Sequence, residues 1–247
     1  MEIAIQQERQ KIDEIDRQLR LLLNERAKVA QKIGKLKGGS AVYRPEREAQ
    51  VLRKAIQDNQ GPLTDPMIFR IQREIMSACL SLEKPLKIGY NQTEFQALWG
   101  LKNQFGSFAI PYALTDLGKK LKELADAQVD YLFLHERDLP ELLREDSCFV
   151  FQGEWRSEVR GEVFYVIGHD ENLPSGQDKT VCVVAEEFDF GSVPTSVLSK
   201  KMLDKEKLLL VEIQGHREEE PLQQWLEAEK NVRVLGSYPF FEELLLP

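Results

Sequence analysis

Several charged side chains near the start of the chain occupy positions where an amphipathic helix would carry apolar residues. Arg26 fills one step in a long series of apolar residues spaced three and four apart. Arg9 lies one step before this series on the same face, and Lys37 lies at its far end. Glu48 begins the apolar stripe of a second segment, and Glu83 follows the last apolar position of a third. Burying an unpaired charge is costly, so these side chains need opposite charges or a ligand.

Two arrangements would satisfy these charges. The first is a network of ion pairs between helices, for example between Arg26 and Glu48, with no ligand. The second is a solvent-poor pocket that is lined by three helices and rich in cations. Such a pocket would suit a small dicarboxylate that carries a hydroxyl group, because the cations outnumber the carboxylates. The positions of the charges leave both arrangements open.

Three helices must position these residues. Residues 8–37 contain no proline and are followed by Gly38 and Gly39, so one helix of about 45 Å is expected. A second helix should start at Pro45, and a third should run from Thr64 to Glu83. The inward positions of the third helix are predicted to be Ile68, Ile71, Ile75, Cys79 and Leu82.

The apolar stripe of the first helix extends over its whole length. Two short helices could not cover such a stripe, so a second copy of the chain is expected to cover the rest. The sequence therefore predicts a homodimer.

The hydrophobic period changes from residue 86 onward. Strands are expected at 86–90, 129–134, 164–167, 181–185, 208–213 and 232–235, and helices at 95–105, 115–127 and 220–230. The expected architecture is therefore multidomain, with an all-α domain of three helices followed by α/β regions. We place the domains at residues 1–84, 85–175 and 176–247.

Composition and charge exclude several classes of protein. No apolar run reaches the ~18 residues of a membrane span, and no signal peptide is recognisable, so no membrane association is expected. The three cysteines have no paired spacing, which is typical of a cytoplasmic protein and excludes a cysteine-based metal site. Residues 1–84 carry 16 basic and 12 acidic side chains, whereas the remainder carries 17 and 29. A small anion bound to the first domain is therefore favoured over a nucleic acid.

Five segments, in order and spacing, carry a resemblance to a known family: residues 9–16, 22–26, 33–37, 43–51 and 74–83. Together they resemble the all-helical chorismate mutase domain at the head of bifunctional chorismate mutase–prephenate dehydratases. The resemblance implies an intertwined helical dimer and a site for chorismate and prephenate. The substrate-binding residues that it implies are Arg9, Arg26, Lys37, Arg44, Arg47, Glu48, Cys79 and Glu83.

The resemblance also implies a role for each residue. Arg9, which would reach into the partner subunit's site, and Arg26 would bind the two carboxylates, with Arg47 as a third pocket arginine. Glu48 would bind the substrate's hydroxyl group. Cys79 stands where the family has a serine, a departure that weakens one polar contact.

The implied reaction is a Claisen rearrangement of chorismate to prephenate, with no covalent intermediate, no cofactor and no metal. The site would hold the substrate in its folded conformer. Lys37 and a protonated Glu83 would donate hydrogen bonds to the ether oxygen as its negative charge grows.

The rest of the chain resembles those bifunctional enzymes only in fragments. Residues 85–90 and 164–168 resemble the two ends of the dehydratase domain, but only one of its two lobes would fit between them. Glu162 and Val163 stand where the family has its catalytic Thr-Arg pair. Residues 179–239 resemble a shortened ACT regulatory domain, in which Ser192–Thr195 replaces the Gly-Ala-Leu of the phenylalanine pocket. The departures imply that dehydratase activity is lost.

Two alternatives remain for this C-terminal region, which could be a remnant that only packs and dimerises or a module that binds a protein partner or an effector. The whole chain also has alternatives to the chorismate mutase interpretation. It could be a non-catalytic subunit that docks onto another shikimate-pathway enzyme, or a lyase that eliminates pyruvate from isochorismate.

Overall fold

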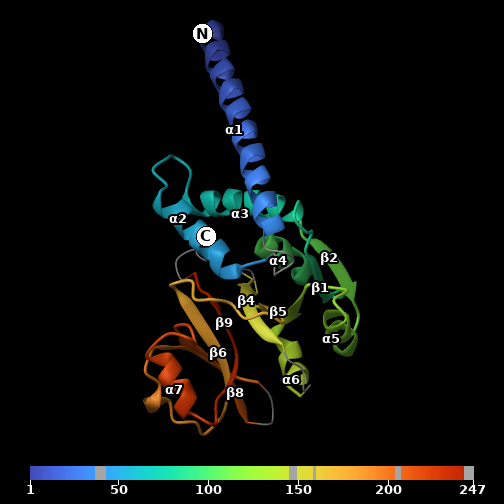
Figure 1. Ribbon diagram of the computed structural model, residues 1–247, viewed down its shortest axis with the longest axis vertical. Coiled ribbons are helices and arrows are strands. Elements are labelled where there is room, and N and C mark those ends of the chain that lie inside the picture. Colours follow the sequence, from blue (N-terminus) through green and yellow to red (C-terminus); the bar gives the residue numbers. More distant parts are fainter. Residues whose placement is uncertain (37–42, 145–148, 158–159, 204–206, 242–247) are drawn as a thin grey trace.

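The computed structural model describes residues 1–36, 43–144, 149–157, 160–203 and 207–241. It begins with α1 (Glu2–Leu36), a helix of 35 residues that projects from the rest of the molecule (Figure 1). The helix α3 (Asp65–Ser81) crosses the base of α1, and α2 (Pro45–Gln57) packs against α3; both lie over the α/β part of the chain. No residue of α1 is buried. None of the helices in the described ranges could span a membrane.

The first helix starts earlier than predicted, at Glu2 instead of residue 8. Residues 2–7 continue the pattern, because Ile5 lies seven residues before Ile12, and Glu2 supplies the negative charge that favours a helix N-terminus. Lys37, which was expected to end this helix, lies outside the described residues.

The buried face of α3 also differs from the prediction. Ile71 and Leu82 are exposed, whereas Arg73, Met76, Ser77 and Cys79 are buried. The end of α4 (Phe95–Phe105) determines this orientation. The Nη1 atom of Arg73 donates to the carbonyl oxygen of Gln104, and a Cβ atom on Gly106 would lie 2.4 Å from Cβ of Ser77. The apolar stripe of α3 is thereby rotated away from the sheet.

A five-stranded sheet with the order β2-β1-β3-β5-β4 follows the helices. Parallel pairs join β1 (Lys87–Asn91) to β2 (Ile110–Leu114) and to β3 (Tyr131–His135). Antiparallel pairs join β3 to β5 (Val163–Gly168) and β5 to β4 (Val150–Arg156). The connecting helices are α4, α5 (Leu117–Ala125) and the short α6 (Leu139–Leu142).

A second sheet is antiparallel and has the order β7-β8-β6-β9. Its strands are β6 (Asp178–Ala185), β7 (Val197–Met202), β8 (Leu208–Gln214) and β9 (Arg233–Pro239), and α7 (Leu222–Ala228) packs against it. One apolar core is continuous between the two sheets, because Leu132 and Phe151 of the first belong to the same cluster as Val181 and Leu235 of the second.

Arg53 joins α2 to the second sheet. Its Nη1 atom donates to the carbonyl oxygen of Ser175 at 3.0 Å and to Oγ of the same residue at 3.1 Å. Its Nη2 atom donates to the carbonyl oxygens of Gln177 at 2.6 Å and Phe240 at 3.1 Å. We call this set of contacts the Arg53 clasp. It fixes α2 against the segments that precede β6 and follow β9.

Candidate active site

A cavity of about 470 Å³ lies between α1, α2 and α3, and we call it the helical cavity. Six of the residues implied for substrate binding line it, namely Arg26, Arg44, Arg47, Glu48, Cys79 and Glu83. The remaining lining residues are apolar: Val29, Ala30, Ile33, Val51, Met76 and Leu80. The structure therefore collects, in one hollow, charges from three segments that are far apart in the sequence.

Helical spacing explains how each element contributes. On α1, Arg26, Ala30 and Ile33 are four and three residues apart and so share one face. On α3 and the turn after it, Met76, Leu80 and Glu83 have the same spacing. The backbone N–H of Glu83 donates to the carbonyl oxygen of Leu80 at 2.9 Å, so the chain keeps a helical turn up to the carboxylate.

Gly34 lets the Glu83 carboxylate approach α1. A Cβ atom at residue 34 would lie 2.6 Å from Oε2 of Glu83, which is closer than side chains tolerate. The same Oε2 atom is buried and has no hydrogen-bond partner among the described residues. A buried acceptor without a partner is costly, which is typical of a group that meets a ligand. Sequence reasoning missed Gly34, although it stands between two residues of the matched segment 33–37.

The ion pair between Arg26 and Glu48, which one of the two alternatives included, is absent from the part of the chain that the structure describes. Burial instead raises the pKa of Glu48 from 4.5 to about 7, and the charges of Arg73 and Arg26 oppose this shift. Arg73 was not predicted as a site residue. Its effect on the pKa of Glu48 follows from the rotated orientation of α3, which the sequence pattern did not predict.

The raised pKa of Glu48 predicts a dependence of stability on pH. Between about pH 4.5 and 7 the folded chain holds a proton that the unfolded chain has lost, so the free energy of unfolding should fall as pH rises. Glu48→Gln should be more stable than the wild type at pH 8, by up to ~3 kcal/mol, and similar to it near pH 5. Urea denaturation at both pH values measures the difference, with Glu25→Gln on the exposed surface of α1 as control. If the free energy of unfolding changes by the same amount in the wild type and in Glu48→Gln between pH 5 and pH 8, this assignment is contradicted.

Among the implied residues that the structure describes, Arg9 does not line the helical cavity. Arg9 is exposed on the projecting half of α1, away from the cavity of its own chain. Lys37 lies outside the described residues, so its position stays a prediction.

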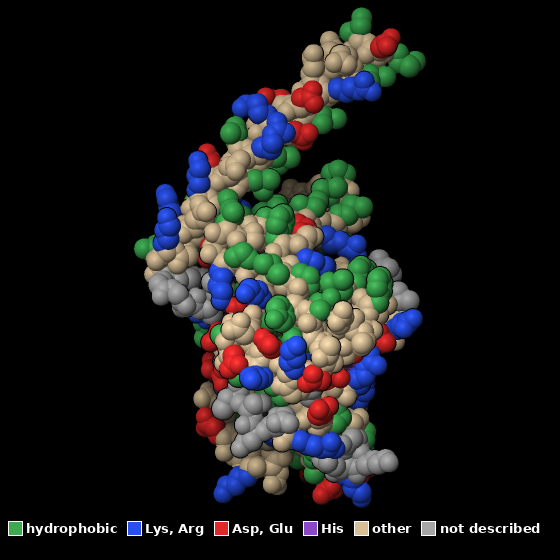
Figure 2. All heavy atoms as spheres, turned by 90° about the vertical axis from the view of Figure 1, so that its right-hand side faces the viewer, with side chains coloured by type: hydrophobic (Ala, Val, Ile, Leu, Met, Phe, Trp, Pro, Cys, Tyr) green, Lys and Arg blue, Asp and Glu red, His purple; other side chains and the backbone are tan. Residues whose placement is uncertain are grey.

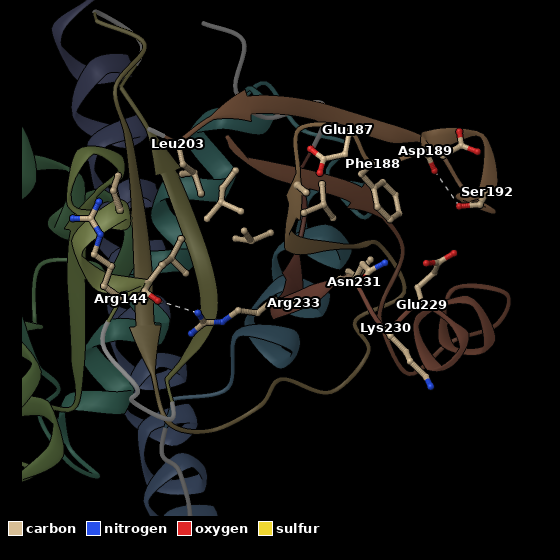
Figure 3. Close-up of a pocket in the computed structure, with 17 residues that line it drawn as sticks. Arg144, Glu187, Phe188, Asp189, Ser192, Leu203, Glu229, Lys230, Asn231 and Arg233 are labelled. Carbon is tan, nitrogen blue, oxygen red and sulfur yellow. Dashed lines mark hydrogen bonds between the residues drawn. The ribbon is translucent and has the colours of Figure 1, made fainter. Parts of the chain in front are cut away.

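A larger cavity, of about 830 Å³, lies elsewhere, between α6 and the second sheet (Figure 3). Arg144, Leu203 and Arg233 lie toward one side of it, and Phe188 and Ser192 lie toward the other. The Nη1 atom of Arg233 donates to the carbonyl oxygen of Leu143 at 2.9 Å. Ser192 belongs to the segment that replaces the family's Gly-Ala-Leu. None of the implied catalytic residues that the structure describes lines this cavity.

Comparison with known proteins divides the chain in two. Residues 8–84 match the family model of chorismate mutase type II. The chain is 45% identical over 126 residues to the bifunctional chorismate mutase/prephenate dehydratase of Neisseria gonorrhoeae, an alignment that covers 50% of this chain and 34% of the relative. It is 39% identical over 132 residues to the enzyme of the same name from Pseudomonas aeruginosa, which covers 50% and 36%. The chain thus spans about a third of the length of these relatives.

A solved structure resembles the α/β part. The prephenate dehydratase from Arthrobacter aurescens in complex with L-Phe aligns over 63% of this chain and 90% of its own, with a TM-score of 0.50 and 11% identity. This likeness shows a prephenate dehydratase type of fold.

Proposed function

Because residues 8–84 form a chorismate mutase type II domain, we propose that this protein catalyses the rearrangement of chorismate to prephenate. The observation that carries the proposal is the helical cavity, where Arg26, Arg47 and two carboxylates from three helices surround a space of about 470 Å³. A dianionic substrate of modest size needs cations for its carboxylates and an acceptor for its hydroxyl group. The reaction needs no cofactor, because holding one conformer and stabilising its transition state suffices.

Each residue of the site has a separate role in this proposal. Arg26, with Arg9 of the partner subunit, binds the two carboxylates of chorismate, and Arg44 and Arg47 add positive charge beside them. Glu48 accepts the hydrogen bond of the hydroxyl group. Glu83 and Lys37 donate to the ether oxygen, where negative charge develops in the transition state. Cys79 and the apolar side chains of α1 and α3 exclude water.

A second copy of the chain completes the site in this proposal. Figure 2 shows hydrophobic side chains along the projecting part of α1. Seven apolar residues of the predicted stripe are 46% to 62% exposed: Ile5, Ile12, Ile15, Leu19, Leu22, Val29 and Ile33. An uncovered stripe of this length is unfavourable in water, so it requires a partner. Pairing α1 with α1 of a second chain would bury the stripe and carry Arg9 of each subunit toward the other's cavity.

Assays of the purified chain with chorismate and with isochorismate test the proposed activity. Formation of prephenate from chorismate is the expected result. Release of pyruvate from isochorismate, without prephenate formation, would identify a lyase instead. Absence of both reactions would favour a non-catalytic subunit.

For the C-terminal region we propose a single-lobe, dehydratase-like unit at 85–175 and an ACT-like unit at 176–247. Glu162 and Val163 occupy the positions of the family's catalytic pair, so no hydroxyl group is available there. Oε1 of Glu162 instead lies 3.9 Å from Nε2 of His135, at the end of β3. The region keeps its fold but lacks the family's catalytic Thr-Arg pair, which supports a structural or regulatory role.

Prephenate should therefore remain unchanged when it is incubated with this protein. Phenylpyruvate absorbance measures the reaction, with a complete bifunctional enzyme as positive control. L-Phenylalanine should not bind with micromolar affinity, because the residues that shape the family's pocket are replaced. A calorimetric titration that detects such binding, or production of phenylpyruvate, would overturn this assignment of the C-terminal region.

A further inference from the structure

A third cavity, of about 500 Å³, lies where the helices meet the α/β part, and we call it the junction cavity. Side chains from α2, α3, α4, β4 and the segment after β9 line it. Glu48 lines both the junction cavity and the helical cavity. The two hollows are therefore separated by a side chain that faces both.

Aromatic side chains form much of the junction cavity. Tyr43, Phe69, Trp155, Phe240 and Phe241 all line it. The rings of Phe69 and Phe241 meet edge to face, with centroids 5.5 Å apart, and the guanidinium of Arg73 lies 4.8 Å from the centroid of Phe69. Rings from separate elements thus surround one space, which favours a flat apolar ligand.

The charge within the cavity favours an anion. Arg73 is 9% exposed, and its Nε atom has no hydrogen-bond partner in the described part of the chain. Within the same ranges, Arg70 and Lys102, which also line the cavity, form no ion pair with a carboxylate. Nζ of Lys102 donates to the carbonyl oxygens of Ser107 and Ala109, both at 2.7 Å, and the carboxylate of Glu74 also lines the cavity. The negative charge of Glu154 is balanced by two ion pairs, because Nε of Arg156 lies 2.9 Å and Nζ of Lys179 lies 2.6 Å from its Oε1. A buried guanidinium with a donor to spare favours a carboxylate as ligand.

We propose that the junction cavity binds a small aromatic carboxylate, with its ring among the aromatic side chains and its carboxylate against Arg73. An α-ammonium group would add positive charge beside Arg70 and Arg73, so an aryl acid without one should bind more tightly than an aromatic amino acid. Because Glu48 faces both cavities, occupancy of the junction cavity alters turnover in the helical cavity. This second statement rests on the proposed chorismate mutase function.

Calorimetry with 3-phenylpropanoate tests the binding site directly. Arg70→Glu reverses a charge on an exposed residue at the cavity and should weaken binding at least ~10-fold. Arg160→Glu reverses an exposed arginine outside the cavity and should leave binding unchanged. Arg26→Gln removes a cation from the helical cavity only and should also leave it unchanged. L-Phenylalanine adds an ammonium group, and 3-cyclohexylpropanoate replaces the aromatic ring by a saturated one. Both should bind more weakly than 3-phenylpropanoate.

Each outcome decides the matter. Absence of binding at millimolar concentration, or binding that Arg26→Gln abolishes and Arg70→Glu leaves intact, would overturn the site. Binding that leaves kcat/KM for chorismate unchanged in the wild type would overturn the coupling through Glu48. The calorimetric result needs no substrate, so failure of the proposed chorismate mutase activity would leave it standing.

Discussion

Arg26→Ala should lower kcat/KM for chorismate at least ~100-fold, the scale of losing one strong transition-state contact. Lys37→Ala should have an effect of the same size. Arg26 is expected to contact a carboxylate of the substrate throughout the reaction, and no other residue of α1 that lines the helical cavity is charged. The fold should survive the Arg26 change, because no residue of α1 is buried and the side chain supports no core.

Steady-state kinetics and thermal unfolding, measured on the same variants, distinguish a loss of catalysis from a loss of stability. Arg20→Ala, which removes an exposed arginine from the same helix outside the helical cavity, should leave both nearly unchanged. If both Arg26→Ala and Lys37→Ala keep their turnover, the assignment of the site fails.

A mixture of two inactive variants should regain activity. In a hybrid dimer of Arg9→Ala and Arg26→Ala chains, one site combines the intact Arg26 of the first chain with the intact Arg9 of the second. Random exchange at equal amounts makes about half of the dimers hybrid, each with one complete site, so about a quarter of wild-type activity should return. Unmixed variants, treated identically, are the controls. Absence of recovery after mass spectrometry has shown subunit exchange would contradict the shared site.

The sequence predicts elements well where the hydrophobic pattern is strong. The helix expected at 95–105 is observed as Phe95–Phe105, and the strand expected at 208–213 is observed as Leu208–Gln214. Both lie against apolar cores, so their buried positions dominate the pattern.

The three strands that were missed, β2, β4 and β7, are all at sheet edges. An edge strand pairs on one side only and tolerates polar residues and proline. Pro111 lies within β2, a bulge interrupts β4 near Gly153, and β7 contains the exposed Lys200 and Lys201. These features obscure the alternation by which a strand is recognised from sequence.

The helical cavity was predictable because charges on amphipathic helices conflict with burial. That conflict is visible in the sequence alone, and it identifies Arg26, Glu48 and Glu83. It could not identify Arg73, whose burial depends on the contact between α3 and the end of α4. Contacts between residues about thirty positions apart leave no periodic trace in the sequence, which also explains why the junction cavity was not foreseen.

The Arg53 clasp has a consequence for how this gene can change. Three of its four acceptors are main-chain carbonyl oxygens, so substitutions at residues 175, 177 and 240 need not break it. A stop codon after the helical segment would remove all of these acceptors. The guanidinium of Arg53 on α2 would then have lost its hydrogen-bond partners in the second half. Glu48 lies on the same helix, five residues away. Substitutions in the appended half can therefore accumulate, while selection on the first half still preserves the reading frame through the segment that follows β9.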